Sequence, residues 1–407
     1  MQRPSGPLLF ILLNLLIDAI GIGIIFPIMP ELMDRVGAGS VAEGAFWAGI
    51  LAASYAAAQF IFAPIVGAIS DAYGRRPVRL VTLARLVLDY VIMALADSYW
   101  LLLLGRSLAG VAGATFVTAT AYIADITPKE DRAARFGLIG AAFGLGFVLG
   151  PALGGIAAEI SLTAPFWLAA ALAFGNLMFG LLVLPESLPE ASRRPFTLRD
   201  SNPFAIIREA VRIPGLSPLL TGSVVVEFGT LVYVVLWAFW GRETFGWSTL
   251  PIGITLSIYG ILLATAQALI MPRAVAWLGE ARLALWGLVL SVAVFAGFGF
   301  AQQLWMLAIL LPLAALTDLV PPTIGAMAAN VTSEDRQGMV QGVIASLASL
   351  AAVIAPLVYT PIFGLFAGPE AWVYLPGAPF LLAGVLVALV IPLLLRGTGE
   401  QTGGDAT

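Results

Sequence analysis

The sequence contains neither cysteine nor histidine. Without cysteine it has no disulfide framework and no thiolate to act as a nucleophile or metal ligand. Without histidine it has no imidazole to bind zinc, to act as a general base or to change charge near neutral pH. These absences exclude thiolate and imidazole metal sites as well as cysteine- or histidine-based catalysis. We expect no cofactor and no resident metal.

Charged side chains are scarce, with 20 basic and 24 acidic residues among 407. The net charge of −4 is too small to indicate a nucleic-acid partner, and none is expected. The mean hydropathy of +0.97 lies far above that of soluble domains. The first apolar run resembles a signal peptide, but it continues past Asp18 to Pro27 without a small-residue cleavage site. The composition therefore predicts a multi-pass membrane protein with a retained first span.

Twelve apolar segments are long enough to cross the hydrocarbon core of a bilayer. They lie near residues 7–29, 45–69, 78–97, 100–124, 134–158, 164–184, 217–240, 248–271, 281–301, 303–326, 337–363 and 371–395. Each is expected to be a helix, because lipid offers the backbone no hydrogen-bond partner. The predicted fold is an all-α integral membrane protein with twelve transmembrane helices in two pseudo-symmetric six-helix bundles. The bundles are expected at 1–185 and 217–396, with a linker at 186–216 and a tail at 397–407.

Short matches between the two halves share an offset of 204 or 205 residues. They pair residues 130–132 (EDR) with 334–336, Gly150-Pro151 with Ala355-Pro356, and Gly74 with Gly279. The shared offset indicates a duplicated six-helix unit. Parallel six-helix repeats with a binding site between them are a transporter architecture. In the linker, Asn202 and Pro203 suit a helix cap and first turn, which predicts a short helix over 203–212.

The distribution of arginine and lysine predicts the orientation of the spans. With the N-terminus in the cytoplasm, sixteen of these residues, Arg79 among them, fall on the cytoplasmic side. Only Arg35 and Arg242 fall outside, while Arg85 and Arg106 lie within spans. Because cytoplasmic connections carry the excess of positive charge, both termini and the linker are predicted to be cytoplasmic.

Four stretches carry a family signature. They read LLIDAIGIGIIFPIMP at 15–30, GAISDAYGRRP at 67–77, LGRSLAGVAGA at 104–114 and GLIGAAFGLGFVLGPALGG at 137–155. As a set they resemble the major facilitator superfamily, and within it the pattern is most similar to the bacterial tetracycline/proton exporters. The resemblance covers the first half almost continuously and is weaker in the second half.

The stretch at 67–77 resembles the loop between spans two and three of that family. The resemblance implies that Asp71 faces the start of the eleventh span and that Arg75 reaches Asp125, which would close the cytoplasmic side. The residues expected in this gate are Gly67, Asp71, Gly74, Arg75, Arg76 and Asp125. Ala72 stands where the family usually has a basic residue. A basic loop that only orients the protein is the alternative.

The stretch at 137–155 resembles the fifth-span motif of the antiporter branch. Its glycines leave much of one helix face without side chains, and its proline bends the helix. The residues of this motif are Gly137, Gly146, Gly150, Pro151, Gly154 and Gly155. Close helix packing at the extracellular side would follow. Ordinary small-residue packing, without antiport, is the alternative.

Charged and polar residues within the spans are the candidates for proton coupling and substrate contact: Asp18, Gln59, Asp89, Arg106, Glu227 and Asp318. Burial disfavours the ionised form of a carboxylate, so such a group can bind and release a proton. Asp89 could instead pair with Arg85 one turn away. The ninth-span acid of the tetracycline exporters is replaced by about Ser291, and their eighth-span histidine is missing near Leu263. Tetracycline is therefore a lead for the substrate.

Together these features predict a proton-coupled antiporter that exports an amphipathic drug-like compound. We expect a monomer in the bacterial inner membrane, whose partners are the substrate, protons and the lipid bilayer. A symporter that imports a sugar or another metabolite is the alternative. The fifth-span motif argues against it, as does PESLPE at 185–190, which departs from the sugar-porter pattern. A membrane enzyme or receptor is not expected, because no nucleophile–base set or phosphate loop is visible.

Overall fold

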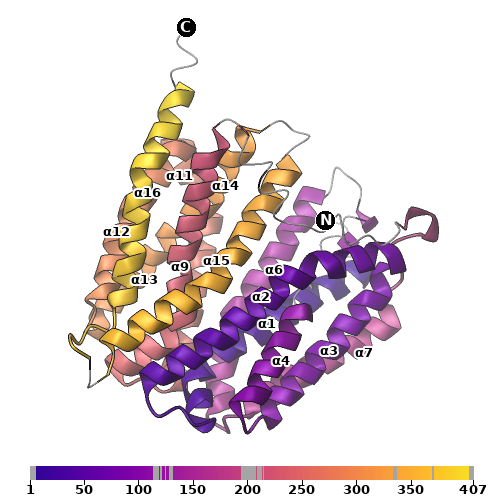
Figure 1. Cartoon of the computed structure of the whole chain (residues 1–407). Helices are drawn as coiled ribbons and strands as arrows, with labels where there is room; N and C mark the ends of the chain where they lie inside the picture. The colour runs from indigo at the N-terminus through magenta and orange to yellow at the C-terminus, as the bar shows by residue number, and fades with distance from the viewer. Residues whose placement is uncertain are drawn as a thin grey trace. The chain divides into compact units, whose positions relative to one another are not determined.

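The computed structural model describes residues 6–112, 119, 122–123, 125–127, 132–193, 208, 213, 215–332, 337–368 and 371–402. Within these ranges all regular structure is helical and no strand occurs (Figure 1). The helices of the first half are α1 (Gly6–Arg35), α2 (Val41–Tyr73), α3 (Arg75–Leu95), α4 (Tyr99–Ala112), α6 (Arg132–Ala158), α7 (Ala164–Val183) and the short η2 (Glu190–Ser192). Those of the second half are α9 (Leu216–Phe245), α10 (Thr249–Thr265), η4 (Ala266–Ile270), α11 (Met271–Leu278), α12 (Glu280–Gly299), α13 (Leu304–Thr317), α14 (Val320–Asn330), α15 (Gln337–Phe366) and α16 (Ala378–Thr402).

The lengths of these helices match the predicted spans. In the part of the chain that the structure describes, nine helical segments are long and apolar enough to cross a membrane, and two shorter apolar helices lie at Tyr99–Val111 and Ala378–Leu394. The remaining predicted span is α3, whose 21 residues include four arginines. Large apolar side chains such as Trp100, Leu182 and Trp277 are well exposed. A lipid environment explains such a surface.

Several helix ends differ from the predicted spans. The first helix continues from residue 29 to Arg35, and the second continues to Tyr73, because a helix need not stop where the hydrocarbon core stops. The last helix begins at Ala378, so the prediction of residue 371 as its start was wrong. The turn before it brings Gly377 so close to Gly299 that a Cβ on Gly377 would overlap the Gly299 backbone.

The predicted tenth span is broken at Asp318. Helix α13 ends at Thr317 and α14 begins at Val320, with Pro321 and Pro322 in the first turn of α14. Prolines lack the N–H that a continuous helix would bond, so the chain makes a short turn before them. The turn places the Asp318 backbone at the C-terminal cap of α13. Transporters form binding sites at such breaks in spanning helices.

The predicted eighth span also contains an irregular turn. A π-helical segment, η4, separates α10 from α11 and is followed by Pro272 in the first turn of α11. The wider π turn gives space to a proline ring, which would collide with a carbonyl in a regular helix. The helical segment continues to Leu278, seven residues past the predicted end at residue 271.

The contacts divide the chain into two compact units. Unit 1 comprises Met1–Gly39, Ser54–Asn202 and Trp247–Gly260, and unit 2 comprises Ser40–Ala53, Pro203–Gly246 and Ile261–Thr407. Each unit thus contains one short segment from the other half of the sequence. The predicted bundle boundaries at residues 185 and 217 stay a prediction.

The core of unit 1 is built around α1. Helix α1 packs against α6 and α7, and α3 packs against α7 and α4. One end of α1 contributes Phe10 and Leu15 to a buried cluster that also contains Leu83 and Tyr122. Phe10 is fully buried and lies 5.5 Å from the ring of Phe179. This packing fixes α1, which carries the first of the predicted proton-coupling residues.

The core of unit 2 is an aromatic cluster between α9, α12 and α16. Tyr233 stacks on Phe295 with the ring centroids 5.5 Å apart. Trp240 meets Phe298 and Phe380 edge-on at 5.9 and 5.3 Å. Aromatic pairs at these separations stabilise a packed interior. These side chains belong to the core of the unit, since Trp240, Phe298 and Phe380 are almost fully buried.

The structure supports the sequence repeat at two of its three matches. Gly74 precedes α3 with φ 104° and ψ 155°, and Gly279 precedes α12 with φ 73° and ψ 161°. Both backbones occupy a region that favours glycine. Pro151 lies inside α6 and Pro356 lies inside α15. Residues 130–131 and 334–336 of the third match lie outside the described residues, as does the predicted helix 203–212 apart from the helical Arg208.

Candidate functional site

Three glycines of the fifth-span motif allow α6 to lie directly against α1. A Cβ built on Gly150 would lie 2.7 Å from the carbonyl oxygen of Ile20, and one on Gly154 would lie 2.5 Å from that of Ile24. Gly146 meets Ala19 in the same way at 2.5 Å. Real Cβ atoms do not come this close to other atoms, so each position requires glycine. The two backbones therefore touch along two turns of helix.

The same part of α6 also contacts the first turns of α10, which belong to unit 1. A Cβ on Gly253 would overlap the carbonyl oxygen of Pro151, and Gly155 lies against Leu250. Ser257 donates a hydrogen bond of 2.7 Å to the carbonyl oxygen of Val148. The remaining motif glycine, Gly137, differs, because a Cβ there would meet no described atom within 4 Å.

Unit 2 contains an equivalent contact between α2 and α15. A Cβ on Gly49 would lie 2.7 Å from the hydroxyl oxygen of Thr360 and 3.3 Å from the carbonyl oxygen of Pro356. Gly49 precedes Gly253 by 204 residues, and Pro151 precedes Pro356 by 205. Within each unit, a glycine from one half of the sequence thus packs against the proline turn from the other half of the sequence. The repeat offset predicts this correspondence.

Asp18 is buried in α1 beside a buried arginine of α3. The carboxylate of Asp18 is 3.9 Å from the guanidinium of Arg79, and the two residues are 6% and 2% exposed. Both carboxylate oxygens lack a hydrogen bond from any described residue. The distribution of basic residues predicts a cytoplasmic connection for Arg79. That assignment was wrong, because Arg79 lies inside α3 and is among the largest fully buried side chains of the described chain.

Asp89 occupies a second buried position in unit 1. It is 3% exposed and lies against Gly105 of α4, and the charges of Arg106 and Arg85 act on its carboxylate. No ion pair joins Asp89 to Arg85 among the described residues, and Arg85 donates a hydrogen bond of 2.6 Å to the carbonyl oxygen of Leu108. The suggested pairing on one helix face is therefore not what the structure has.

Two tyrosines lie close to both carboxylates, and Arg106 lies close to Asp89. The guanidinium of Arg106 lies over the ring of Tyr55, 4.5 Å from its centroid. The charges of Asp18, Asp89 and Arg106 all act on Tyr55 and on the buried Tyr90. Unit 1 therefore brings together three of the predicted coupling residues from α1, α3 and α4. Gln59 of α2 also belongs to unit 1 and is partly buried.

The remaining two candidates lie in unit 2. Glu227 is partly buried in α9, and Asp318 is partly buried at the break between α13 and α14. The charge of Asp318 acts on Tyr233 of the aromatic cluster. Among the residues that the structure describes, no group of three acidic side chains could hold a metal ion.

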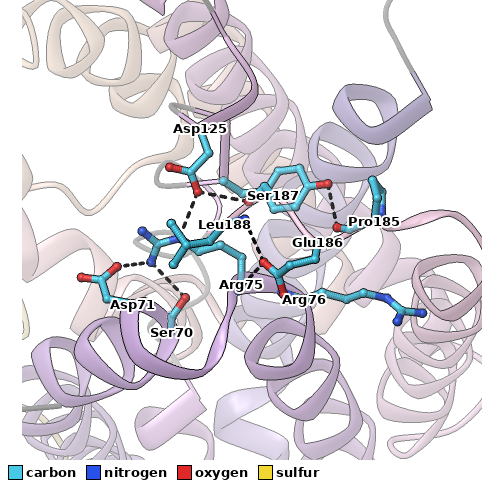
Figure 2. A network of polar contacts seen from close by, with 10 residues as sticks. Ser70, Asp71, Arg75, Arg76, Asp125, Pro185, Glu186, Ser187 and Leu188 are labelled. Atoms are coloured by element: carbon cyan, nitrogen blue, oxygen red, sulfur yellow. Dashed lines mark hydrogen bonds and ion pairs between the residues drawn. The ribbon is translucent and has the colours of Figure 1, made fainter. Parts of the chain in front are cut away.

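Arg75 is the centre of a polar network at the start of α3 (Figure 2). Its guanidinium pairs with Asp71 at 2.5 Å and with Asp125 at 3.2 Å, and it donates a hydrogen bond of 3.0 Å to the hydroxyl of Ser70. The expected contact of Arg75 with Asp125 is thus present. The expected position of Asp71 against the eleventh span concerns the other unit and stays a prediction.

Glu186 completes this network and was missed in the sequence. Its carboxylate accepts hydrogen bonds from the backbone N–H groups of Arg75 at 2.8 Å and of Arg76 at 3.2 Å (Figure 2). A negative group there satisfies free N–H groups at the N-terminus of α3. The next residue, Ser187, donates a hydrogen bond of 3.1 Å to Asp125. Glu186 lies in PESLPE, the stretch that departs from the sugar-porter pattern, but nothing in that stretch predicts these backbone partners.

These features define the class of protein: a membrane transporter with paired buried charges within its helices and close helix crossings. Residues 11–301 match the family described as Major Facilitator Superfamily, and the chain belongs to this superfamily. It is 38% identical to the tetracycline resistance protein, class C, of Escherichia coli, over 98% of this chain and 99% of that protein. It is 31% identical to the class B protein of Escherichia coli, over 95% of this chain and 96% of that protein.

Solved structures agree with this assignment. The human organic anion transporter MFSD10 (TETRAN) is 27% identical, with a TM-score of 0.72 over 96% of this chain and 100% of that chain. A point mutant of the nucleoside transporter NupG has a TM-score of 0.78 over 97% of this chain and 100% of that chain. Its identity of 12% makes it evidence for the fold alone. The predicted all-helical superfamily fold is confirmed.

Proposed function

We propose that this chain is a proton-coupled antiporter that exports a tetracycline-like compound from the bacterial cytoplasm. The names of its relatives and their near-complete coverage support efflux of such a drug. The packing of Gly146, Gly150 and Gly154 against α1 supports the antiporter branch over a sugar symporter. The protein acts as a monomer in the inner membrane and catalyses no chemical reaction.

The proposed coupling mechanism is supported by one observation. Unit 1 contains two buried carboxylates with arginines beside them. A carboxylate within a span is costly unless it is neutralised by a proton or a positive charge. Asp18 and Asp89 can therefore exist in either state, and exchange between the two states moves a proton. Glu227 and Asp318 take the place of the ninth-span acid that the chain lacks.

At least one of the four acids is expected to be obligatory for uphill transport. Moving one charge through 100 mV supplies roughly 2.3 kcal/mol, enough for a gradient of roughly fifty-fold. Asp18→Asn, the first candidate, is expected to retain downhill exchange of tetracycline and to lose accumulation against a gradient. The measurement is tetracycline accumulation in proteoliposomes under an imposed pH gradient, with Asp89→Asn, Glu227→Gln and Asp318→Asn in parallel.

The control for this experiment is exchange without a pH gradient, which reports folding and binding. Full uphill transport by all four variants would exclude coupling through any single one of these side chains. A symporter would instead move substrate and protons in the same direction, and the sign of the proton flux separates it from the proposed antiporter.

Both termini and the linker are expected on the cytoplasmic side. The support is the excess of basic residues in the even-numbered connections, which remains after Arg79 is moved into α3. Because the chain has no cysteine, Ser192→Cys would be its single thiol. This thiol should be protected from a membrane-impermeant reagent in intact cells and react once the membrane is opened. Labelling in intact cells would show that the linker lies outside, so the predicted topology would be wrong.

A further inference from the structure

Arg79 is an arginine in the interior of unit 1 that the family signature does not assign. It is 2% exposed and comes one turn after Arg75 on α3. Its guanidinium reaches the carboxylate of Asp18 at 3.9 Å, a distance for charge attraction without a direct hydrogen bond. Asp18 belongs to α1, so the pair joins two helices.

A buried guanidinium requires a nearby negative charge. Arginine stays protonated at every pH that a protein experiences, so it cannot become neutral as lysine can. Its neighbour Thr82, whose hydroxyl donates a hydrogen bond to the Arg79 carbonyl oxygen, is buried and polar but uncharged. Asp18 is the carboxylate that forms an ion pair with Arg79 in the described part of unit 1.

The other groups around Asp18 do not replace this charge. Tyr55 of α2 and Tyr90 of α3 are the further ionisable groups that its carboxylate influences. Helix α6 carries basic residues only at its beginning, Arg132 and Arg135, and α7 carries no charged residue. Besides burial, Arg79 is therefore the charged group of the described chain that acts on the carboxylate of Asp18.

We propose that Arg79 is the positioning residue of Asp18 and sets the pH at which Asp18 takes up and releases the coupling proton. The positive charge favours the carboxylate and so drives release of the proton. When Asp18 is protonated, Arg79 loses its opposite charge, and the pair is restored only by deprotonation. This inference rests on the proposed antiport, in which Asp18 must alternate between the two states.

The sign of the effect follows from electrostatics. Without the positive charge, the neutral, protonated form of Asp18 is favoured, so higher pH is needed to remove the proton. An arginine beside a carboxylate shifts its half-protonation point by about one pH unit or more. Arg79→Met and Arg79→Gln should therefore move the pH profile of uphill tetracycline transport in the alkaline direction by about one unit. Arg79→Lys keeps the charge and should stay closer to the wild type.

The test combines transport with a direct measurement of protonation. Infrared difference spectra of the purified full chain are recorded across a pH series, and the carboxyl band that disappears in Asp18→Asn is assigned to Asp18. The midpoint of this band should shift in Arg79→Met and in Arg79→Gln. In the Asp18→Asn background, which retains downhill exchange, Arg79→Met should cause no shift in the pH profile of that exchange. Thermal unfolding and size-exclusion chromatography identify variants that do not fold, and Arg79→Lys supplies a folded comparison.

The outcomes separate the two proposals. A wild-type protein that shows no proton-driven uphill transport would overturn the proposed function, while the infrared midpoint still tests the pair. An unchanged midpoint in folded Arg79→Met or Arg79→Gln would overturn the role of Arg79. A slower transport rate at every pH with an unchanged pH profile would show that Arg79 has only a structural role. This result would also overturn the proposal.

Discussion

Gly154→Leu is expected to reduce transport to background, whereas Gly144→Leu, ten residues earlier on the same helix, should retain most of it. At Gly154 even a Cβ would lie 2.5 Å from the carbonyl oxygen of Ile24, so leucine must push α6 away from α1. Overpacking of this kind costs about 1–3 kcal/mol. At Gly144, by contrast, an added Cβ meets no described atom within 4 Å.

The pair of variants is compared by tetracycline export and by the amount of folded protein in the membrane. Gly150→Leu should behave like Gly154→Leu, because its Cβ would approach Ile20 and Gly23. A folded Gly154→Leu protein with wild-type export would show that the α1–α6 contact is dispensable for the transport cycle. Loss of export in Gly144→Leu would show that export does not depend on close packing at the substituted glycine.

Arg75→Ala is expected to lower export at least tenfold, and Asp71→Asn to weaken it in the same direction. The alanine variant removes the ion pairs to Asp71 and Asp125 together, whereas the asparagine variant removes one of them. A charged group left without its partner in a half-buried network destabilises that network by about 1–3 kcal/mol. Glu186 would still cap α3, so the helix itself should form.

The matched control for this pair is Arg35→Ala. Arg35 forms an ion pair with Asp97 at 2.6 Å, but the carboxylate is largely exposed. Such surface pairs contribute only about 0–1 kcal/mol, so export should stay near the wild-type level. Rates are measured at equal amounts of folded protein. Near-normal export by Asp71→Asn would exclude this aspartate from the gating step, and an equal loss in Arg35→Ala would show a general effect of removing arginine.

The sequence predicted the helical content and the general placement of the spans, since hydropathy measures what can lie in lipid. It could not predict where helices end, because polar residues extend α1 to Arg35 and α2 to Tyr73 at no cost in water. The break at Asp318 had a local signal in Pro321 and Pro322. Hydropathy averaged over a span does not detect it.

The site was predicted in part. Asp18 and Asp89 were identified as charges within spans, and the contact of Arg75 with Asp125 followed from the resemblance. Arg79 was misplaced because a basic residue near a loop satisfies the topology rule equally well whether it faces water or the interior. Glu186 was missed because its partners are backbone N–H groups of α3, which leave no trace in side-chain patterns. Contacts of this type depend on the tertiary fold alone.

The two helix crossings at which a glycine packs against a proline turn are reciprocal between the two halves of the sequence. Such reciprocity is a property of symmetric assemblies. Gly49 meets the turn of Pro356, while its repeat counterpart Gly253 meets Pro151, the counterpart of Pro356. In an isologous interface between identical subunits, residue i of one chain contacts residue j of the other, and j contacts i. The single chain retains this relation between its repeats. Two copies of a six-helix ancestor would have made the same crossing twice with one glycine and one proline, so a single ancestral substitution would have altered both crossings at once.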